Sequence, residues 1–292
     1  MSEPDQPGTY AFRRRDVRRR ADESAGQGGD FLSRHTRSEL LGRLSLTTLD
    51  PRRVLDAGAA TGAASRELAA RYRQARVVSM DLSPRRMAAA RRGHGRFARR
   101  YEVVGDAARL PFRGGVFDLV FANLLLPFFP EPQSIAREVA RVLRPEGLFT
   151  FSSLGPDSFL ELREAWRSVG SEPRVPAFLD MHDIGDALVA AGFRDPVLDV
   201  ERLTITYGEP DDLWRDLRAA GARNTLAERR RGLATPGLFR RATGHWERSR
   251  REGRLPLSVE LVYGHCWGGN ALPASPGSGE IRISPDRILR RS

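Results

Sequence analysis

The chain has 292 residues, and 40% of them are hydrophobic, which is enough to bury one substantial core with a smaller subdomain attached. No stretch approaches the roughly 18 consecutive apolar residues of a membrane-spanning helix, and the first residues lack the apolar segment of a secretory signal. The single cysteine, Cys266, excludes an intrachain disulfide and a cysteine-based metal cluster. We therefore expect a soluble, cytoplasmic protein that holds no metal.

The formal net charge is +11, and a basic surface attracts polyanions. All 48 basic residues are arginine, a bias that a GC-rich genome explains more simply than selection for phosphate contacts. We therefore expect no nucleic-acid partner. The arginine-rich runs at 13–20 and 229–231 are interpreted as compositional, with an acidic protein partner as the alternative.

The predicted elements begin after a polar segment. Residues 1–30 are charged and glycine-bearing, and we interpret them as an arm that folds over a site without joining the core. Apolar residues at helical spacing predict a helix over 31–46. Strand and helix patterns then alternate, which predicts a mostly parallel sheet covered on both faces. The predicted strands are 53–57, 76–81, 101–104, 117–123 and 148–153, and the predicted helices between them are 63–72, 84–91 and 134–143.

The pattern changes in the second half of the chain. Two strand patterns, 197–207 and 257–267, should complete the sheet as antiparallel strands, and helices between them should form a cap over the ligand. The fold class is therefore α/β, a doubly wound Rossmann-like sheet with a helical insertion before the last strand. The helices predicted here are 157–169, 181–191, 210–220 and 236–251. We divide the chain into an arm (1–30), a cofactor-binding core (31–155), the rest of the sheet with its cap (156–268) and a glycine- and proline-bearing tail (269–292).

Three strand ends carry the candidate ligand site. Ligands of open α/β sheets bind outside the carboxyl ends of the strands, where the strand order reverses. Residues 56–62 read Asp-Ala-Gly-Ala-Ala-Thr-Gly, and small residues there let the backbone approach a ligand while the next helix directs its N–H groups at a carboxylate. Asp81 ends the second strand and suits ribose hydroxyls, and Asp106 follows the third strand and suits an exocyclic amine. The three ends predict a site for one nucleoside-sized ligand.

These residues, together with Phe-Asp-Leu-Val at 117–120, resemble the class I S-adenosylmethionine methyltransferases over about residues 50–155. The resemblance implies that the glycine-rich turn holds the methionine part of the cofactor, Asp81 the ribose and Asp106 the adenine. The usual middle glycine of the turn is Ala60 here. NAD is disfavoured because its G-x-G-x-x-G spacing is absent. The expected cofactor-binding residues are Asp56, Gly58, Ala60, Gly62, Asp81, Leu82, Asp106, Ala107 and Asn123.

The methyl acceptor is indicated by other segments. Residues 123–126 read Asn-Leu-Leu-Leu, whereas enzymes that methylate amines of nucleic acids typically carry Asn-Pro-Pro-aromatic, so base methylation is disfavoured. From about 31 to 265 the chain resembles the malonyl-acyl-carrier-protein O-methyltransferases of biotin synthesis. The resemblance implies methyl transfer to the free carboxylate of a malonyl thioester on an acidic carrier protein. The segments that carry it are 121–126, 151–158, 161–166, 178–186, 221–224, 253–257 and 262–265.

Two departures leave alternatives open. Pro127 and Phe128 replace a common Gln-Trp pair, and the arm is closer to a sister family of mitochondrial complex I assembly factors that is associated with arginine hydroxylation. A protein-modifying relative or a catalytically silent assembly factor is therefore the alternative function. No catalytic side chain is identified, and Trp166 is expected in the core. The candidate substrate contacts are Tyr10, Arg174, His182 and Asn224, of which His182 also suits a helix start and Asn224 a turn.

Overall fold

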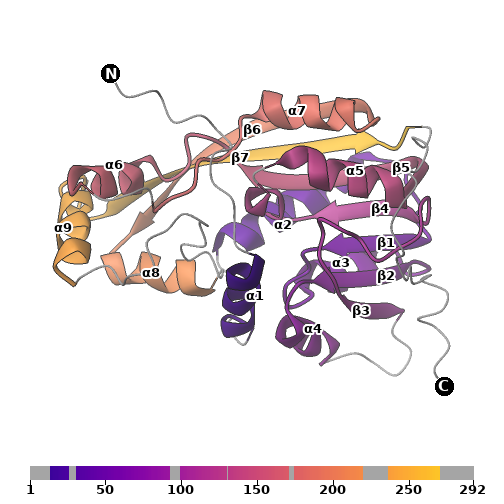
Figure 1. The fold of residues 1–292 in the computed structure, drawn as a ribbon, viewed down its shortest axis with the longest axis horizontal. Helices are drawn as coiled ribbons and strands as arrows, with labels where there is room; N and C mark the ends of the chain where they lie inside the picture. The colour runs from indigo at the N-terminus through magenta and orange to yellow at the C-terminus, as the bar shows by residue number, and fades with distance from the viewer. Residues whose placement is uncertain are drawn as a thin grey trace.

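The computed structural model describes residues 14–25, 31–92, 99–129, 131–170, 174–219 and 236–269. One seven-stranded sheet has the order β3-β2-β1-β4-β5-β7-β6 (Figure 1). The strands from β3 to β5 are parallel, and β7 is antiparallel to both β5 and β6. This sheet confirms the predicted fold class. The strands are β1 (Arg53–Ala57), β2 (Arg76–Asp81), β3 (Arg100–Val104), β4 (Phe117–Ala122), β5 (Leu143–Leu154), β6 (Arg194–Tyr207) and β7 (Leu255–Trp267).

Helices cover both faces because successive strand residues point to opposite sides of the sheet. In β1, Val54 packs in a cluster with helices α2 (Phe31–Arg43) and α3 (Ala63–Arg71). Its neighbour Leu55 packs in a second cluster with α5 (Pro132–Val142) and α7 (Met181–Ala190). Helix α4 (Pro84–Arg91) contacts β2 and β3, and short 3₁₀ turns follow α2 (Leu44–Leu46) and β4 (Leu126–Phe128).

The last two strands extend beyond the rest of the sheet. Leu154 at the end of β5 pairs with Leu261 of β7, so residues 255–260 continue past β5 while paired with β6. At about 3.3 Å per residue this extension is about 20 Å long. It carries α8 (Pro210–Ala219) and α9 (Pro236–Glu247), and α6 (Leu160–Ser168) packs on α9, beyond the carboxyl ends of the parallel strands (Figure 1). The predicted insertion before the last strand is therefore confirmed.

Several predicted boundaries are wrong. The arm contains helix α1 (Arg14–Glu23), which packs on α4 with Ala21 buried, although its sequence holds few apolar residues. Helix α6 begins at Leu160 instead of 157, because residues 155–158 form a turn around the side chain of Glu260 in β7. Helix α9 ends at Glu247, where Ser249 and Arg250 form turns on the preceding residues. Among the helices in the described parts of the chain, none is long and apolar enough to cross a membrane.

Candidate active site

The turn between β1 and α3 is built from left-handed backbone. Gly58 and Gly62 have φ of 74° and 75°, which costs glycine little. Ala60 has φ of 48°, a region that a residue with a Cβ rarely adopts. The amides of Gly58 and Ala59 donate to Met80 O, and the amide of Ala60 donates to Asp81 Oδ2 at 3.0 Å. The end of β2 therefore fixes the turn.

The first turn of α3 offers N–H groups to an anionic ligand, although the Ser65 amide of that turn is already bonded to the Asp56 carboxyl. Its N-cap residue, Gly62, offers no side chain to the helix, and no acidic residue occupies the first turn. The leading N–H groups of a helix have no intrahelical acceptor and lie at the positive end of its dipole. This end of α3 therefore has the chemistry to receive a carboxylate, as the sequence predicts.

Asp81 lies at the centre of the site with its side chain only 7% exposed. Its Oδ1 accepts from Ser83 N at 2.9 Å, its Oδ2 accepts from Ala60 N, and Arg86 Nη1 lies 3.7 Å away. A carboxylate accepts about four hydrogen bonds, so these contacts leave it capacity for donors from a ligand. Asp106 is half-buried, and its Oδ1 accepts from Ala108 N at 2.9 Å, which closes the turn after β3.

Asp56 lies in β1, beneath the glycine turn. Its side chain is buried, and Oδ2 accepts from Ser65 Oγ of α3 at 2.5 Å, while Ser79 Oγ of β2 donates to Ser65 Oγ at 2.6 Å. Burial raises the pKa of the Asp56 carboxyl to about 7, although the hydrogen bonds from Ser65 oppose the rise. Asp56 thus joins β1 and β2 to the helix that follows the turn.

Helix α1 closes one side of the site. Asp22 Oδ1 accepts from Ser83 Oγ at 2.5 Å, and Arg86 Nη2 donates to Ser24 Oγ at 2.7 Å. Ser83 also caps α4 by accepting from Arg86 N. These contacts of Asp22 and Ser24 lie at Ser83, two residues from Asp81, and at Arg86, whose guanidinium also lies 3.7 Å from Asp81, so they tie the arm to the predicted ribose site.

Asn123 fixes the end of β4. Its Nδ2 donates to Ser33 O of α2 at 2.9 Å, and its Oδ1 accepts from Ser152 Oγ of β5 at 2.9 Å. The next side chain but one, Leu125, packs on the glycine turn, where a Cβ at Gly58 would lie 2.9 Å from Leu125 Cδ1. An apolar side chain thus borders the turn from the β4 side.

The turn after β5 winds around the buried carboxylate of Glu260. Glu260 Oε2 accepts from Asp157 N at 2.9 Å, and Arg202 Nη2 donates to Oε1 at 2.9 Å. Gly155 leaves the necessary space, because a Cβ there would lie 2.5 Å from Glu260 Oε2. Arg163 donates to the carbonyls of Pro156 and Ser158 from the other side. The 151–158 segment is thus held by contacts within the scaffold.

The remaining predicted residues lie in different places. His182 is at the start of α7 with a 79% exposed side chain, where it contacts the capping residue Asp180. The Arg174 guanidinium lies 4.9 Å from the Trp166 ring, and Trp166 is buried as expected. Leu82 is half-buried and Ala107 buried, next to the predicted acids. Tyr10 and Asn224 lie outside the described residues.

Four residues of the site are missing from the sequence-based set: Ser65, Asp22, Leu125 and Glu260. Asp22 and Glu260 contact residues 61 and 103 positions away, so no local pattern reports them. Ser65 could have been found, since it lies on the first turn of the helix that follows Asp56. Leu125 lies two residues after the predicted Asn123, in a segment that indicates the family and disfavours base methylation but marks no single site residue besides Asn123.

Known proteins with similar sequences and folds agree with this geometry. A model of the family described as "Methyltransferase domain" matches residues 55–151. The YcgJ protein from Bacillus subtilis covers 80% of this chain and 99% of its own at a TM-score of 0.58 and 15% identity, a likeness of fold. A malonyl-acyl-carrier-protein O-methyltransferase of Methylovorus sp. strain MP688 is 42% identical over 94% of this chain and 96% of its own. A protein of the same name from Halorhodospira halophila is 42% identical over 95% of this chain and 96% of its own. Because this identity extends over nearly the full length of both relatives, the chain belongs to the malonyl-acyl-carrier-protein O-methyltransferase family.

Proposed function

We propose that this protein transfers a methyl group from S-adenosylmethionine to the free carboxylate of a malonyl thioester on an acyl carrier protein, a step of biotin precursor synthesis. The observation that carries the proposal is the match at 42% identity across almost the whole chain, including the insertion, to relatives of that name. The arrangement of Asp81, Asp106 and the open end of α3 supports the cofactor.

The residues present fit the cofactor. The α3 amides would receive its carboxylate, Asp81 would accept from the ribose hydroxyls, and Asp106 would lie beside the adenine, with Leu82 and Ala107 as apolar neighbours. Asp56 and Asn123 would position the elements around the cofactor and would not contact it, since their side chains bond to Ser65 and Ser33 within the protein. S-adenosylmethionine, when bound, supplies a methyl group on a positively charged sulfur, which retains the electron pair of the broken carbon–sulfur bond.

The chain needs no general base for this reaction. A carboxyl group with an ordinary pKa of about 4 is already ionised at neutral pH, so no side chain must remove a proton. The protein would contribute alignment and exclusion of water. Leu125 at the glycine turn and helix α1 beside Asp81 are placed to exclude water from two sides.

The insertion is the proposed acceptor side. Its helices α8 and α9 meet α6 in an aromatic cluster, in which Phe239 of α9 lies 5.9 Å from Trp166 of α6 and 4.9 Å from Trp214 of α8, measured between ring centroids. Arg174 stacks on Trp166 at the edge of this cluster. We propose Arg174 as the partner of the acceptor carboxylate, because a guanidinium binds a carboxylate with two parallel hydrogen bonds. Tyr10, His182 and Asn224 remain proposed substrate contacts.

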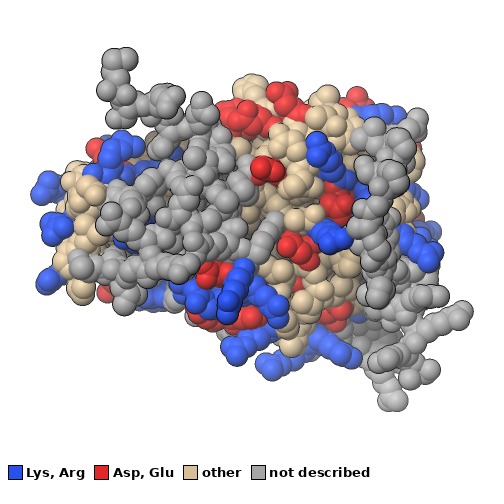
Figure 2. All heavy atoms as spheres, in the orientation of Figure 1, with Lys and Arg blue, Asp and Glu red and all other residues tan. Residues whose placement is uncertain are grey.

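An acidic carrier would meet a basic surface. Figure 2 shows arginine side chains gathered along the lower edge of the face in view, over α1 and α4. Exposed arginines on these helices include Arg15, Arg18, Arg19, Arg85 and Arg91. Complementary charge speeds encounter between proteins, and added salt screens it. Raising salt should therefore raise KM more for the carrier-linked substrate than for malonyl-CoA.

Mass spectrometry of the carrier tests the proposal. Malonyl-loaded carrier incubated with protein and S-adenosylmethionine should gain the mass of one methyl group, and mild base should remove it as expected for an ester. Unloaded carrier should gain nothing. If calorimetry shows S-adenosylhomocysteine bound while the malonyl carrier stays unmodified, the assignment is wrong, and a protein-modifying relative or an assembly factor becomes the better hypothesis.

A further inference from the structure

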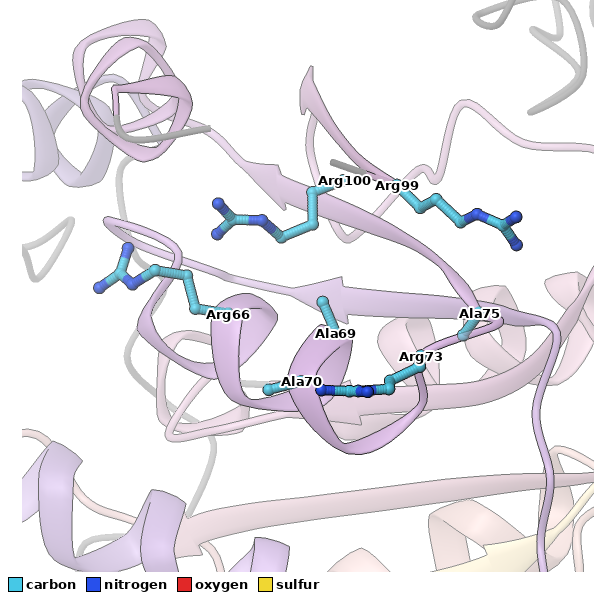
Figure 3. Close-up of a pocket in the computed structure, with 7 residues that line it drawn as sticks. All are labelled: Arg66, Ala69, Ala70, Arg73, Ala75, Arg99 and Arg100. Carbon is cyan, nitrogen blue, oxygen red and sulfur yellow. The ribbon is translucent and has the colours of Figure 1, made fainter. Parts of the chain in front are cut away.

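A second candidate ligand site lies at the outer edge of the sheet. A pocket of about 370 Å³ opens between α3 and the start of β3, the edge strand (Figure 3). Four of its seven lining residues are arginines, and the other three are alanines, so small side chains leave space between long charged ones. The volume is in the range of small-molecule sites, about 300–1,000 Å³. The lining residues are Arg66, Ala69, Ala70, Arg73, Ala75, Arg99 and Arg100.

The arginines come from two separate segments and are concentrated around one space. In Figure 3 the side chains of Arg66 and Arg100 extend toward the same end of the pocket from α3 and β3. Burial and, to a smaller extent, the neighbouring charge of Arg66 lower the pKa of Arg100, while the charge of Glu102 opposes the decrease. Arg99 extends toward the opposite end, where its Nη1 donates to Gln74 O at 3.2 Å. Positive charge therefore borders both ends.

No carboxylate is among the residues that line the pocket. Glu102, two positions along β3, lies near Arg100, and the charges of both Arg100 and Arg91 act on its carboxylate. Arginine-rich composition explains many arginines on a surface, but it does not explain four of them around one concave, alanine-floored space. Like charges that lie near each other repel, and an anion bound between them removes that repulsion.

We propose that this pocket binds a small anion that carries two or more phosphoryl groups. Guanidinium groups bind phosphate oxygens with paired, charge-assisted hydrogen bonds, and charges at both ends of the pocket suit an extended anion better than a single phosphate. The site is separate from the cofactor turn but connected to it, because Arg66 Nη1 donates to Thr61 O in that turn at 3.0 Å. The proposal does not depend on the methyl acceptor.

Calorimetry with inorganic pyrophosphate tests the site in the full-length protein. S-adenosylhomocysteine is kept saturating, so that the cofactor site cannot bind the probe, and ionic strength is held constant with chloride. Arg73→Gln and Arg100→Gln should each weaken pyrophosphate binding about tenfold. Arg71→Gln is the matched control, because Arg71 is an exposed arginine at the end of α3, two residues before Arg73, and does not line the pocket. Arg73 is also exposed, so its substitution tests the site even if Arg100→Gln disturbs β3.

The three variants distinguish a specific anion site from a general effect of net charge. Saturable binding that both pocket variants weaken and Arg71→Gln leaves within about twofold supports the site. Parallel titrations with adenosine diphosphate and adenosine monophosphate show whether a free polyphosphate or a nucleotide is preferred, and the monophosphate should bind more weakly than either. Absence of pyrophosphate binding, or equal weakening by all three variants, would overturn the proposal, since a general effect of net charge would then suffice.

Discussion

The cofactor side and the proposed acceptor side of this protein are stabilised by contacts of different range. Around the glycine turn, the Ala60 amide donates to Asp81 and the Ser65 hydroxyl donates to Asp56, so the contacts lie within one β-α-β unit. Around Glu260, one buried carboxylate joins β7 to a turn 103 residues earlier and to Arg202 of β6. The cofactor side therefore depends on contacts between residues close in sequence, and the proposed acceptor side on a few long-range contacts.

The largest expected effect is on the pH dependence of the unfolding free energy, through Asp56 on the cofactor side. The folded-state pKa of Asp56, raised by burial to about 7, lies above its unfolded value of about 4. The folded protein then keeps a proton that the unfolded chain has lost, so this stabilisation is complete below about pH 4 and is lost as pH rises through about 7. Asp56→Asn should remove a decline of up to about 4 kcal/mol in unfolding free energy between those pH values.

Urea unfolding at a series of pH values checks this prediction. The difference between wild type and Asp56→Asn isolates the one carboxyl group from every other titrating side chain. Parallel curves for the two proteins from pH 4 to pH 8 would show that Asp56 is ionised throughout, and the account of its burial would fail.

A second substitution acts on the acceptor side. Glu260→Ala removes a buried acceptor from the Asp157 amide and a partner from Arg202, and should lower the unfolding free energy by about 2–3 kcal/mol. Glu260→Gln keeps an oxygen that can accept from the Asp157 amide, so its unfolding free energy should fall by less. Calorimetry should give nearly unchanged affinity for S-adenosylhomocysteine in the folded variants, whereas a loss of cofactor binding equal to that in Asp81→Ala would remove the distinction between the sides.

Asp81 gives the converse test. Asp81→Ala should weaken cofactor affinity by about 1–3 kcal/mol, because charge-assisted hydrogen bonds to the ribose are lost and the Ala60 and Ser83 amides lose their acceptor. Asp81→Asn retains one carbonyl oxygen, so its cofactor affinity should lie between that of Asp81→Ala and that of the wild type. Calorimetric titration of S-adenosylhomocysteine measures both. Wild-type affinity in Asp81→Ala would exclude this carboxylate from the site.

The smallest effect concerns the replaced glycine of the turn. Ala60 has a left-handed backbone conformation that costs a residue with a Cβ about 1–2 kcal/mol, and Ala60→Gly relieves it while adding freedom to the unfolded chain. We expect a gain of up to about 1 kcal/mol in unfolding free energy and cofactor affinity at least equal to wild type. Thermal unfolding with and without cofactor measures both changes, and a clear loss of stability would contradict a strained Ala60.

Much of the cofactor side could be predicted from sequence because its signals are local. The bounds of β1, β2 and α4 agree with the predicted strands and helix, since apolar runs end at Asp81 and a Ser-Pro pair begins α4. Helix α1 lies outside the predicted elements, because Arg14–Glu23 holds Val17 and Ala21 as its only apolar residues and docks partly through the polar contacts of Asp22 and Ser24. The inward position of Asp56 depends on the rotation of α3 relative to β1, which a sequence pattern does not report.

The same reasoning explains the acceptor side. The segments at 151–158 and 253–257 indicate the family, but the structure shows them holding the scaffold. Gly155 makes room for Glu260, and Arg254 donates to Thr206 of β6. The proposed acceptor side depends on how α6, α8 and α9 pack together, and aromatic contacts between separate helices leave no signal in local spacing.

The most direct test of the separation between the two sides is a paired measurement on Phe239→Ala. Phe239 of the insertion contacts Trp214 of α8 and Trp166 of α6. The S-adenosylhomocysteine dissociation constant and the KM for malonyl carrier protein are measured in the same preparation, with Val189→Ala, an exposed position on α7, as control. We predict a KM raised about tenfold with a dissociation constant within about twofold of wild type. Weakened cofactor binding with an unchanged KM for the carrier would contradict the assignment of the insertion to the acceptor.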